Sequence, residues 1–94
     1  MEDRILRDIV EKIDSLVSQV NERPSIEVAW DIISVTWGNN VDIMIFNNNY
    51  PELIRIADLA TDIEAYGEDE EYGKELWNAL TFNLDLVKRK LATL

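Results

Sequence analysis

Residues 25–46 read SIEVAWDIISVTWGNNVDIMIF, and this stretch decides which fold the chain adopts. Gly38, Asn39 and Asn40 fit a three-residue hairpin turn, because these residue types tolerate a positive φ. Strands on either side of the turn would place apolar residues opposite one another on one face, in the pairs Trp37 with Val41, Val35 with Ile43, and Ile33 with Ile45. Residue types that strands prefer also dominate the stretch. The pattern therefore favours a β-hairpin.

The same stretch also fits a helix. Ser25 would cap its start and Gly38 would end it. One face of this helix would carry Ile26, Trp30, Ile33 and Trp37. We keep the helix as the alternative, because periodicity alone does not separate a short apolar strand from a buried helix. In either fold we expect Trp30 and Trp37 to lie in the core.

Amphipathic helices are predicted on both sides of this stretch. The first covers residues 2–20, where the apolar stripe is Ile5, Leu6, Ile9, Val10, Ile13, Leu16, Val17 and Val20. The second begins near Pro51 and ends at Gly67, with the stripe Leu53, Ile56, Ala57, Ala60 and Ile63. The third opens at Glu68 and Asp69 and carries Tyr72, Leu76, Leu80, Leu84, Val87 and Leu91. Its acidic start and its basic end, residues 88–90, both complement the helix dipole.

These elements predict an α+β fold in one small acidic domain over residues 1–94, in the order helix, β-hairpin, helix, helix. The helices would pack on one face of the hairpin, because two strands alone are not stable in water. The alternative fold is an all-α bundle.

The residue types that most enzymes rely on are missing. The chain has no histidine and no cysteine, and its three glycines do not form a phosphate-binding loop. A calcium loop beginning at Asp62 fails, because Tyr66 and Gly73 occupy positions where that loop needs oxygen side chains. The sequence therefore predicts no catalytic residue, no metal site and no cofactor.

The net charge of −10 limits the choice of partner. Nucleic acid and anionic membranes repel such a chain, so we expect no direct binding to either. No stretch reaches the ~18 apolar residues of a membrane span, and charges interrupt the N-terminal stretch where a signal peptide would need an apolar run. The expected location is the cytoplasm, and the expected partner is a protein with a basic surface.

Acidic residues gather where the second predicted helix meets the third. Residues 67–73 read GEDEEYG, and no lysine or arginine occurs between Arg55 and Lys74. A field of one sign attracts a partner of the opposite sign, and tyrosine beside charge suits an interface. The candidate partner-binding residues are Asp58, Asp62, Glu64, Tyr66, Glu68, Asp69, Glu70, Glu71 and Glu75. Tyr72 is expected in the core instead, because it lies on the apolar stripe of the last helix.

The stretch EDEEYGKELWNALTFNLDL, residues 68–86, together with the amphipathic start of the chain, resembles small acidic phage proteins of the anti-CRISPR type. Bacteriocin and contact-toxin immunity proteins are similar in size and charge. Either resemblance implies an inhibitor, which would occupy the basic groove where a nuclease or another nucleic-acid-handling protein holds its substrate.

The alternative function is that of a helical interaction or regulatory subunit. The helix over residues 2–20 is apolar on both sides of its stripe, which favours docking through that helix or a homodimer. Salt separates the two functions, because rising ionic strength weakens an acidic interface and leaves an apolar one intact.

Overall fold

The computed structural model describes residues 2–20, 26–39, 43–44 and 48–93. Within this part of the chain there are four long helices, which are α1 (Glu2–Val17), α2 (Ile26–Gly38), α4 (Glu52–Tyr66) and α5 (Glu70–Ala92). No β-strand occurs among the described residues. The fold is all-helical, and the three helices predicted outside residues 25–46 are confirmed.

The predicted β-hairpin is contradicted, so the α+β fold class is wrong. Its first strand lies inside α2, and Ile43 and Met44 of its second strand have helical backbone. Its other partners Val41 and Ile45 lie outside the described residues. The buried side chains of α2 recur at helical spacing and are Val28, Ala29, Ile32 and Thr36. The all-α alternative is therefore correct.

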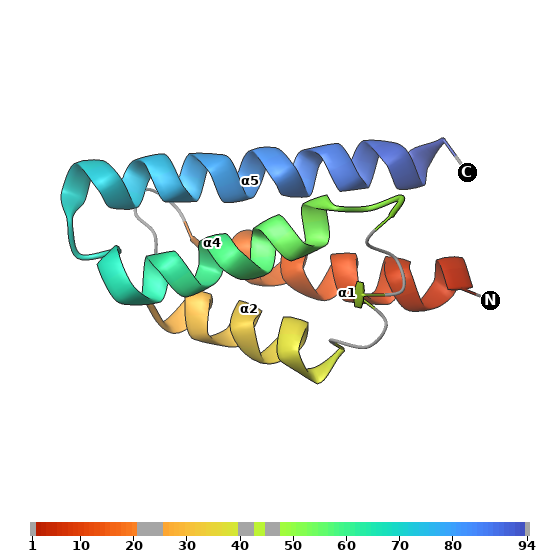
Figure 1. Cartoon of the computed structure of the whole chain (residues 1–94), viewed down its shortest axis with the longest axis horizontal. Helices are drawn as coiled ribbons and strands as arrows, with labels where there is room; N and C mark the ends of the chain where they lie inside the picture. Colours follow the sequence, from red (N-terminus) through yellow and green to blue (C-terminus); the bar gives the residue numbers. More distant parts are fainter. Residues whose placement is uncertain (1, 21–25, 40–42, 45–47, 94) are drawn as a thin grey trace.

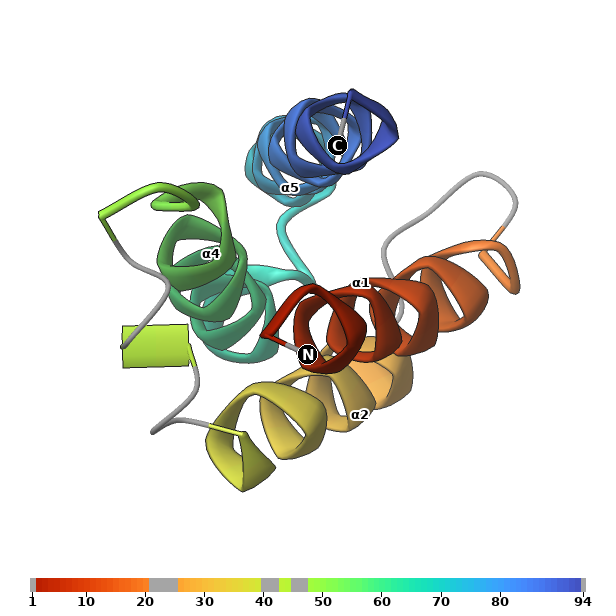
Figure 2. The ribbon, with the colours of Figure 1, turned by 90° about the vertical axis from the view of Figure 1, so that its right-hand side faces the viewer.

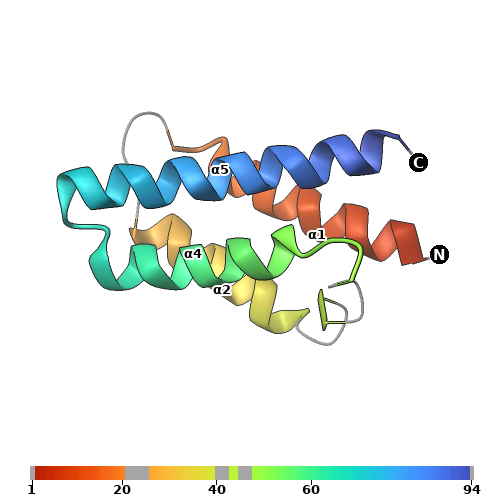
Figure 3. The same ribbon diagram turned by 45° about the horizontal axis from the view of Figure 1, so that its top comes forward.

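The helices form a ring in which each one packs against two neighbours. α1 packs against α2 and α5, and α4 also packs against α2 and α5. Each helix runs antiparallel to both of its neighbours, as Figures 1 and 2 show. This is the up-down-up-down order of a four-helix bundle. The start of α1 and the end of α5 therefore lie at one end, and the connection from α4 to α5 lies at the other (Figure 3).

The core runs along the middle of this ring and receives apolar side chains from every helix. α1 contributes Leu6, Ile9, Val10 and Ile13. α4 contributes Leu53, Ile56, Ala60 and Ile63. α5 contributes Leu76, Leu80, Leu84, Val87 and Leu91. Burial of such side chains is the main force that holds helices of this length together.

Polar contacts tie the last turns of α5 to α1. Arg7 donates a hydrogen bond to the backbone oxygen of Leu91, at 2.9 Å. Lys88 pairs with Asp14 of α1, at 3.0 Å.

No helix in the described part of the chain has the length and apolarity needed to cross a membrane.

Candidate partner-binding surfaces

The acidic corner, defined as Glu68, Asp69, Glu70 and Glu71, connects α4 to α5. Gly67 caps α4, and its backbone N–H donates to the oxygen of Ile63 at 2.7 Å. Asp69 is the N-cap of α5, and its carboxylate accepts a hydrogen bond from the backbone N–H of Tyr72 at 2.9 Å. These two caps let the chain reverse direction within three residues. All four acids of the corner are exposed as a result.

The positive end of the α5 dipole provides part of the balancing charge for this corner, because Glu70 and Glu71 lie in the first turn. Among the described residues, no cation lies within ion-pair distance of Glu68 or Glu71. Asp8, Asp14, Glu52 and Asp85, which lie outside the corner, each form an ion pair with a lysine or arginine. The corner is thus an exposed group of carboxylates that is only partly compensated. Within the described residues, no three acidic side chains are arranged to hold a metal ion.

The helical geometry of α4 separates the remaining acids of the predicted site. Asp62 and Glu64 are two positions apart, so their side chains leave the helix about 160° from one another. Both are half-buried, on different sides of α4. Asp58 is exposed and lines a groove between α4 and α2. Glu75 is exposed one turn beyond Glu71. The predicted residues therefore do not form one face: the corner and Glu75 belong to one surface, and Asp58 belongs to another.

Two tyrosines accompany the acidic corner. The ring centroids of Tyr66 and Tyr72 are 6.0 Å apart, with their planes tilted by 54°. Tyr66 is 57% exposed and Tyr72 is 43% exposed. The prediction that Tyr72 lies in the core is therefore wrong. Tyr72 lies in the first turn of α5, and its position on the apolar stripe of that helix does not bury it there.

A second surface lies on α2 and was not predicted. Trp30 is 57% exposed and Trp37 is 68% exposed, so the expectation that both lie in the core is wrong. They are seven positions apart, which places them on one stripe two turns from each other. Ile33, on the same stripe, is partly buried against the core. Met44 adds to this apolar surface and is 70% exposed.

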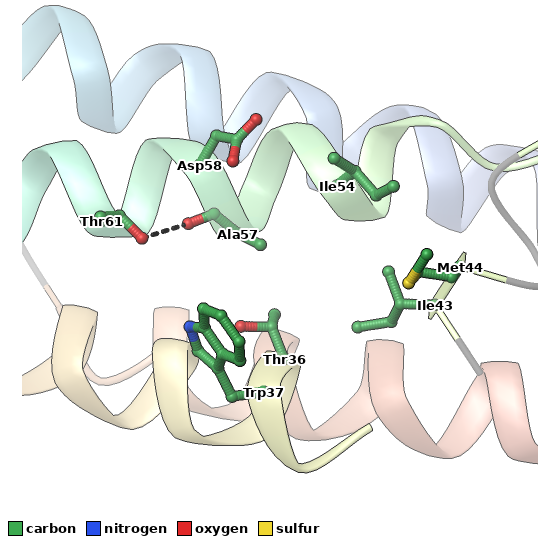
Figure 4. A pocket seen from close by; sticks show the side chains of 8 residues that line it. All are labelled: Thr36, Trp37, Ile43, Met44, Ile54, Ala57, Asp58 and Thr61. Carbon is green, nitrogen blue, oxygen red and sulfur yellow. Dashed lines mark hydrogen bonds between the residues drawn. The ribbon is translucent and has the colours of Figure 1, made fainter. Parts of the chain in front are cut away.

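The groove between α2 and α4, shown in Figure 4, has a volume of about 230 Å³. Its lining residues are Thr36, Trp37, Ile43, Met44, Ile54, Ala57, Asp58 and Thr61. Both threonine hydroxyls donate to backbone oxygens of their own helices, Thr36 to Ile33 at 2.9 Å and Thr61 to Ala57 at 3.0 Å. The groove is therefore apolar apart from Asp58 on the α4 side.

Two acids of α2, Glu27 and Asp31, are also exposed, and α2 contains no lysine or arginine. Neither is among the predicted partner-binding residues, which lie between Asp58 and Glu75. The only signal in the sequence was the absence of a basic residue between Arg23 and Arg55.

No protein-family model matches this chain, and no similar protein was found among curated proteins or solved structures. The resemblance of residues 68–86 to anti-CRISPR and immunity proteins stays a prediction.

Proposed function

We propose that this chain is a non-enzymatic inhibitor that binds the basic surface of a nuclease or of another DNA- or RNA-handling protein, as anti-CRISPR, anti-restriction and toxin-immunity proteins do. The observation that carries the proposal is the acidic corner, where Glu68 and Glu71 are exposed and have no ion-pair partner among the described residues. A cytoplasmic location is part of the proposal, because such partners meet nucleic acid there.

The corner would act as a substitute for phosphates. Carboxylates spaced along the start of a helix present negative charge to lysine and arginine side chains that otherwise hold a nucleic-acid backbone. The field of the corner would speed encounter with such a partner, and Tyr66 and Tyr72 would supply flat contact area beside the charges. Inhibition would then be competitive, because the protein and the nucleic acid would occupy the same groove.

The first experiment identifies the partner. The wild-type chain is used to recover proteins from cells of its source organism, and the recovered protein is then purified and titrated in isolation. We expect a protein with a basic groove whose affinity for this chain falls as salt rises and as nucleic acid is added. A partner whose affinity for this chain changes neither with salt nor with added nucleic acid would contradict the proposal.

A pair of matched variants then tests the surface. Glu68→Gln with Glu71→Gln removes two charges from the corner and leaves the N-cap Asp69 in place. Asp8→Asn with Glu11→Gln removes two charges from the exposed side of α1 and serves as the control. We expect the corner variant to associate more slowly, by roughly three- to tenfold, and the control variant to associate at the wild-type rate. The opposite result would place the interface on α1.

A second candidate function is an interaction or regulatory subunit that uses an apolar helix face, and one observation favours it. Trp30 and Trp37 are more than half exposed on α2. The apolar face of α1 suits this function less well, because Leu6, Ile9 and Val10 are buried in the core, and Ile5 is the one exposed apolar side chain of α1 among the residues whose burial is described, at 44%. A homodimer through α1 would therefore have little free apolar area to bury.

A further inference from the structure

We propose that the groove between α2 and α4 binds a basic amphipathic helix of a protein partner, with apolar side chains of that helix on Trp30 and Trp37 and a lysine or arginine on Asp58. This inference goes beyond the proposed function, because it uses a different surface and requires none of the residues of the acidic corner.

The size of the groove favours side chains over a free small molecule. Its volume of about 230 Å³ is below the ~300–1,000 Å³ of typical small-molecule pockets. It is nonetheless large enough for one or two apolar side chains. Because both threonine hydroxyls are engaged by the backbone, the groove has little to offer a polar ligand.

The exposed tryptophans favour an interface at this place. Trp37 forms one wall of the groove, across from Ala57 and Thr61 of α4, as Figure 4 shows. Trp30 continues the same stripe two turns earlier on α2, about 10 Å away along the axis. Two tryptophans that are mostly exposed gain little from folding, whereas tryptophan is among the residues that contribute most to binding. A helix with apolar residues at i, i+3 or i+4, and i+7 has the spacing to contact both of them.

Asp58 at the groove and the exposed acids of α2 favour a basic partner and disfavour a second copy of this chain. Asp58 lies at the groove and Glu27 and Asp31 lie on α2, where no cation occurs. Arg55 is the one basic residue of α4, and no ion pair joins it to Asp58 within the described residues. A second copy would bring its own net charge of −10 to this surface, and like charges oppose association.

The test uses a fluorescent synthetic helix of about 18 residues, built from leucine at the contact positions and lysine elsewhere. Its binding is followed by anisotropy at ~150 mM salt, where long-range attraction between surface charges is largely screened. Two comparison peptides are a scrambled sequence of the same composition and a version with glutamate in place of lysine. We expect only the basic amphipathic peptide to bind at micromolar concentration.

Four variants of the protein locate the peptide. Trp37→Ala is expected to weaken its affinity by roughly tenfold or more, and Asp58→Asn by a few-fold. Phe82→Ala removes an equally exposed aromatic ring from α5, at 64% exposed, and is expected to leave the affinity unchanged. The corner variant Glu68→Gln with Glu71→Gln is also expected to have little effect. None of these side chains is buried in the core, so the variants should all fold.

Several results would overturn the inference. One is the absence of peptide binding at ~100 μM, and another is equal binding of the acidic or the scrambled peptide. A loss of binding in the corner variant alone would assign the peptide to the acidic corner, which would support the proposed function and reject the groove. Dimerisation of the wild-type chain in sedimentation, abolished by Trp37→Ala, would make a second copy the occupant and would also reject the inference.

Discussion

Lys90 donates a hydrogen bond from Nζ to Oε1 of Glu52 and so joins the last turns of α5 to the first turn of α4. Glu52 is buried, at 4% exposed, whereas the side chain of Lys90 is 44% exposed. Oε2 of Glu52 has no hydrogen-bond partner within the described residues. Lys90 also donates to the backbone oxygen of Asn49, at 3.2 Å. The ammonium of Lys90 therefore compensates the charge of a buried carboxylate and links α5 to α4 at this end of the bundle.

Removing that ammonium should destabilise the fold. Lys90→Met keeps most of the aliphatic stem and leaves the carboxylate of Glu52 without its cation. We expect the free energy of unfolding in urea to fall by about 1–3 kcal/mol, which is the cost of leaving a buried polar group unpaired. Adding Glu52→Gln should recover part of the loss, because no buried charge then remains. A double variant that loses the full sum of both single effects would show that the two residues do not act as a pair.

The two glycines at helix ends should respond differently to alanine. A Cβ at Gly67 would lie 2.4 Å from the backbone oxygen of Ile63, whereas a Cβ at Gly38 would meet nothing within 4 Å. We expect Gly67→Ala to lower the free energy of unfolding by about 1–3 kcal/mol. Gly38→Ala should be neutral or stabilise by up to about 1 kcal/mol, because neither glycine has a positive φ. Equal effects at the two positions, measured by urea unfolding, would contradict the close approach at Gly67.

Asp69 combines a cap with a charge, and two substitutions separate these roles. Asp69→Asn keeps a side-chain oxygen for the backbone N–H of Tyr72 and should change stability little. Asp69→Ala removes the cap and should cost about 0.5–2 kcal/mol. Thermal unfolding of both variants measures the difference. If the two variants lose the same stability, the charge and not the hydrogen bond is what stabilises the start of α5.

The sequence was sufficient to predict α1, α4 and α5, because each has one apolar stripe opposite a charged face. α2 differs, since it has two apolar faces. One face is buried and includes Ile32, and the other is exposed to solvent and includes Trp30 and Trp37. Together they make seven of the ten residues from 28 to 37 apolar, so the helical period is hard to recognise and a strand fits as well. Only the packing of α1 and α4 against one side of this segment decides whether it forms a helix or a strand.

The candidate site, like the fold, could be predicted from the sequence only in part. The acidic corner was predictable, because its four residues are consecutive and lie between two helices with clear ends. The separation of Asp62 from Glu64 follows from 3.6 residues per turn and was available from the sequence once the helix was accepted. That Asp58 and Trp37 line one groove could not be predicted, because it depends on how α4 packs against α2.

A comparison of two residues on α2 tests which of its faces is buried. Ile32→Ala should cost about 2–5 kcal/mol, since Ile32 is fully buried among the four helices. Trp37→Ala removes a larger side chain but one that is 68% exposed, so we expect a change of no more than about 0.5–1 kcal/mol. Urea unfolding followed by circular dichroism measures both. A larger loss at Trp37 than at Ile32 would mean that α2 is rotated, and that the groove does not exist as described.

Salt should stabilise this protein, and the two charge-neutralised variants should change that response to different extents. Wild-type stability is expected to rise as salt is increased from ~10 to ~500 mM, because a net charge of −10 repels itself and salt screens the repulsion.

Glu68→Gln with Glu71→Gln removes repulsion at the acidic corner, so the free energy of unfolding of this variant should depend less on salt than that of wild type. Asp8→Asn with Glu11→Gln removes attraction instead: Asp8 pairs with Lys12 at 3.3 Å, and Glu11 lines the same groove as Arg7 and Lys88. In that variant the salt-induced gain should be larger than in the corner variant, because the loss of favourable pairs offsets the lower net charge. Equal salt dependence in the two variants would mean that the corner carries no more uncompensated charge than the surface of α1, which would remove the observation on which the proposed function rests.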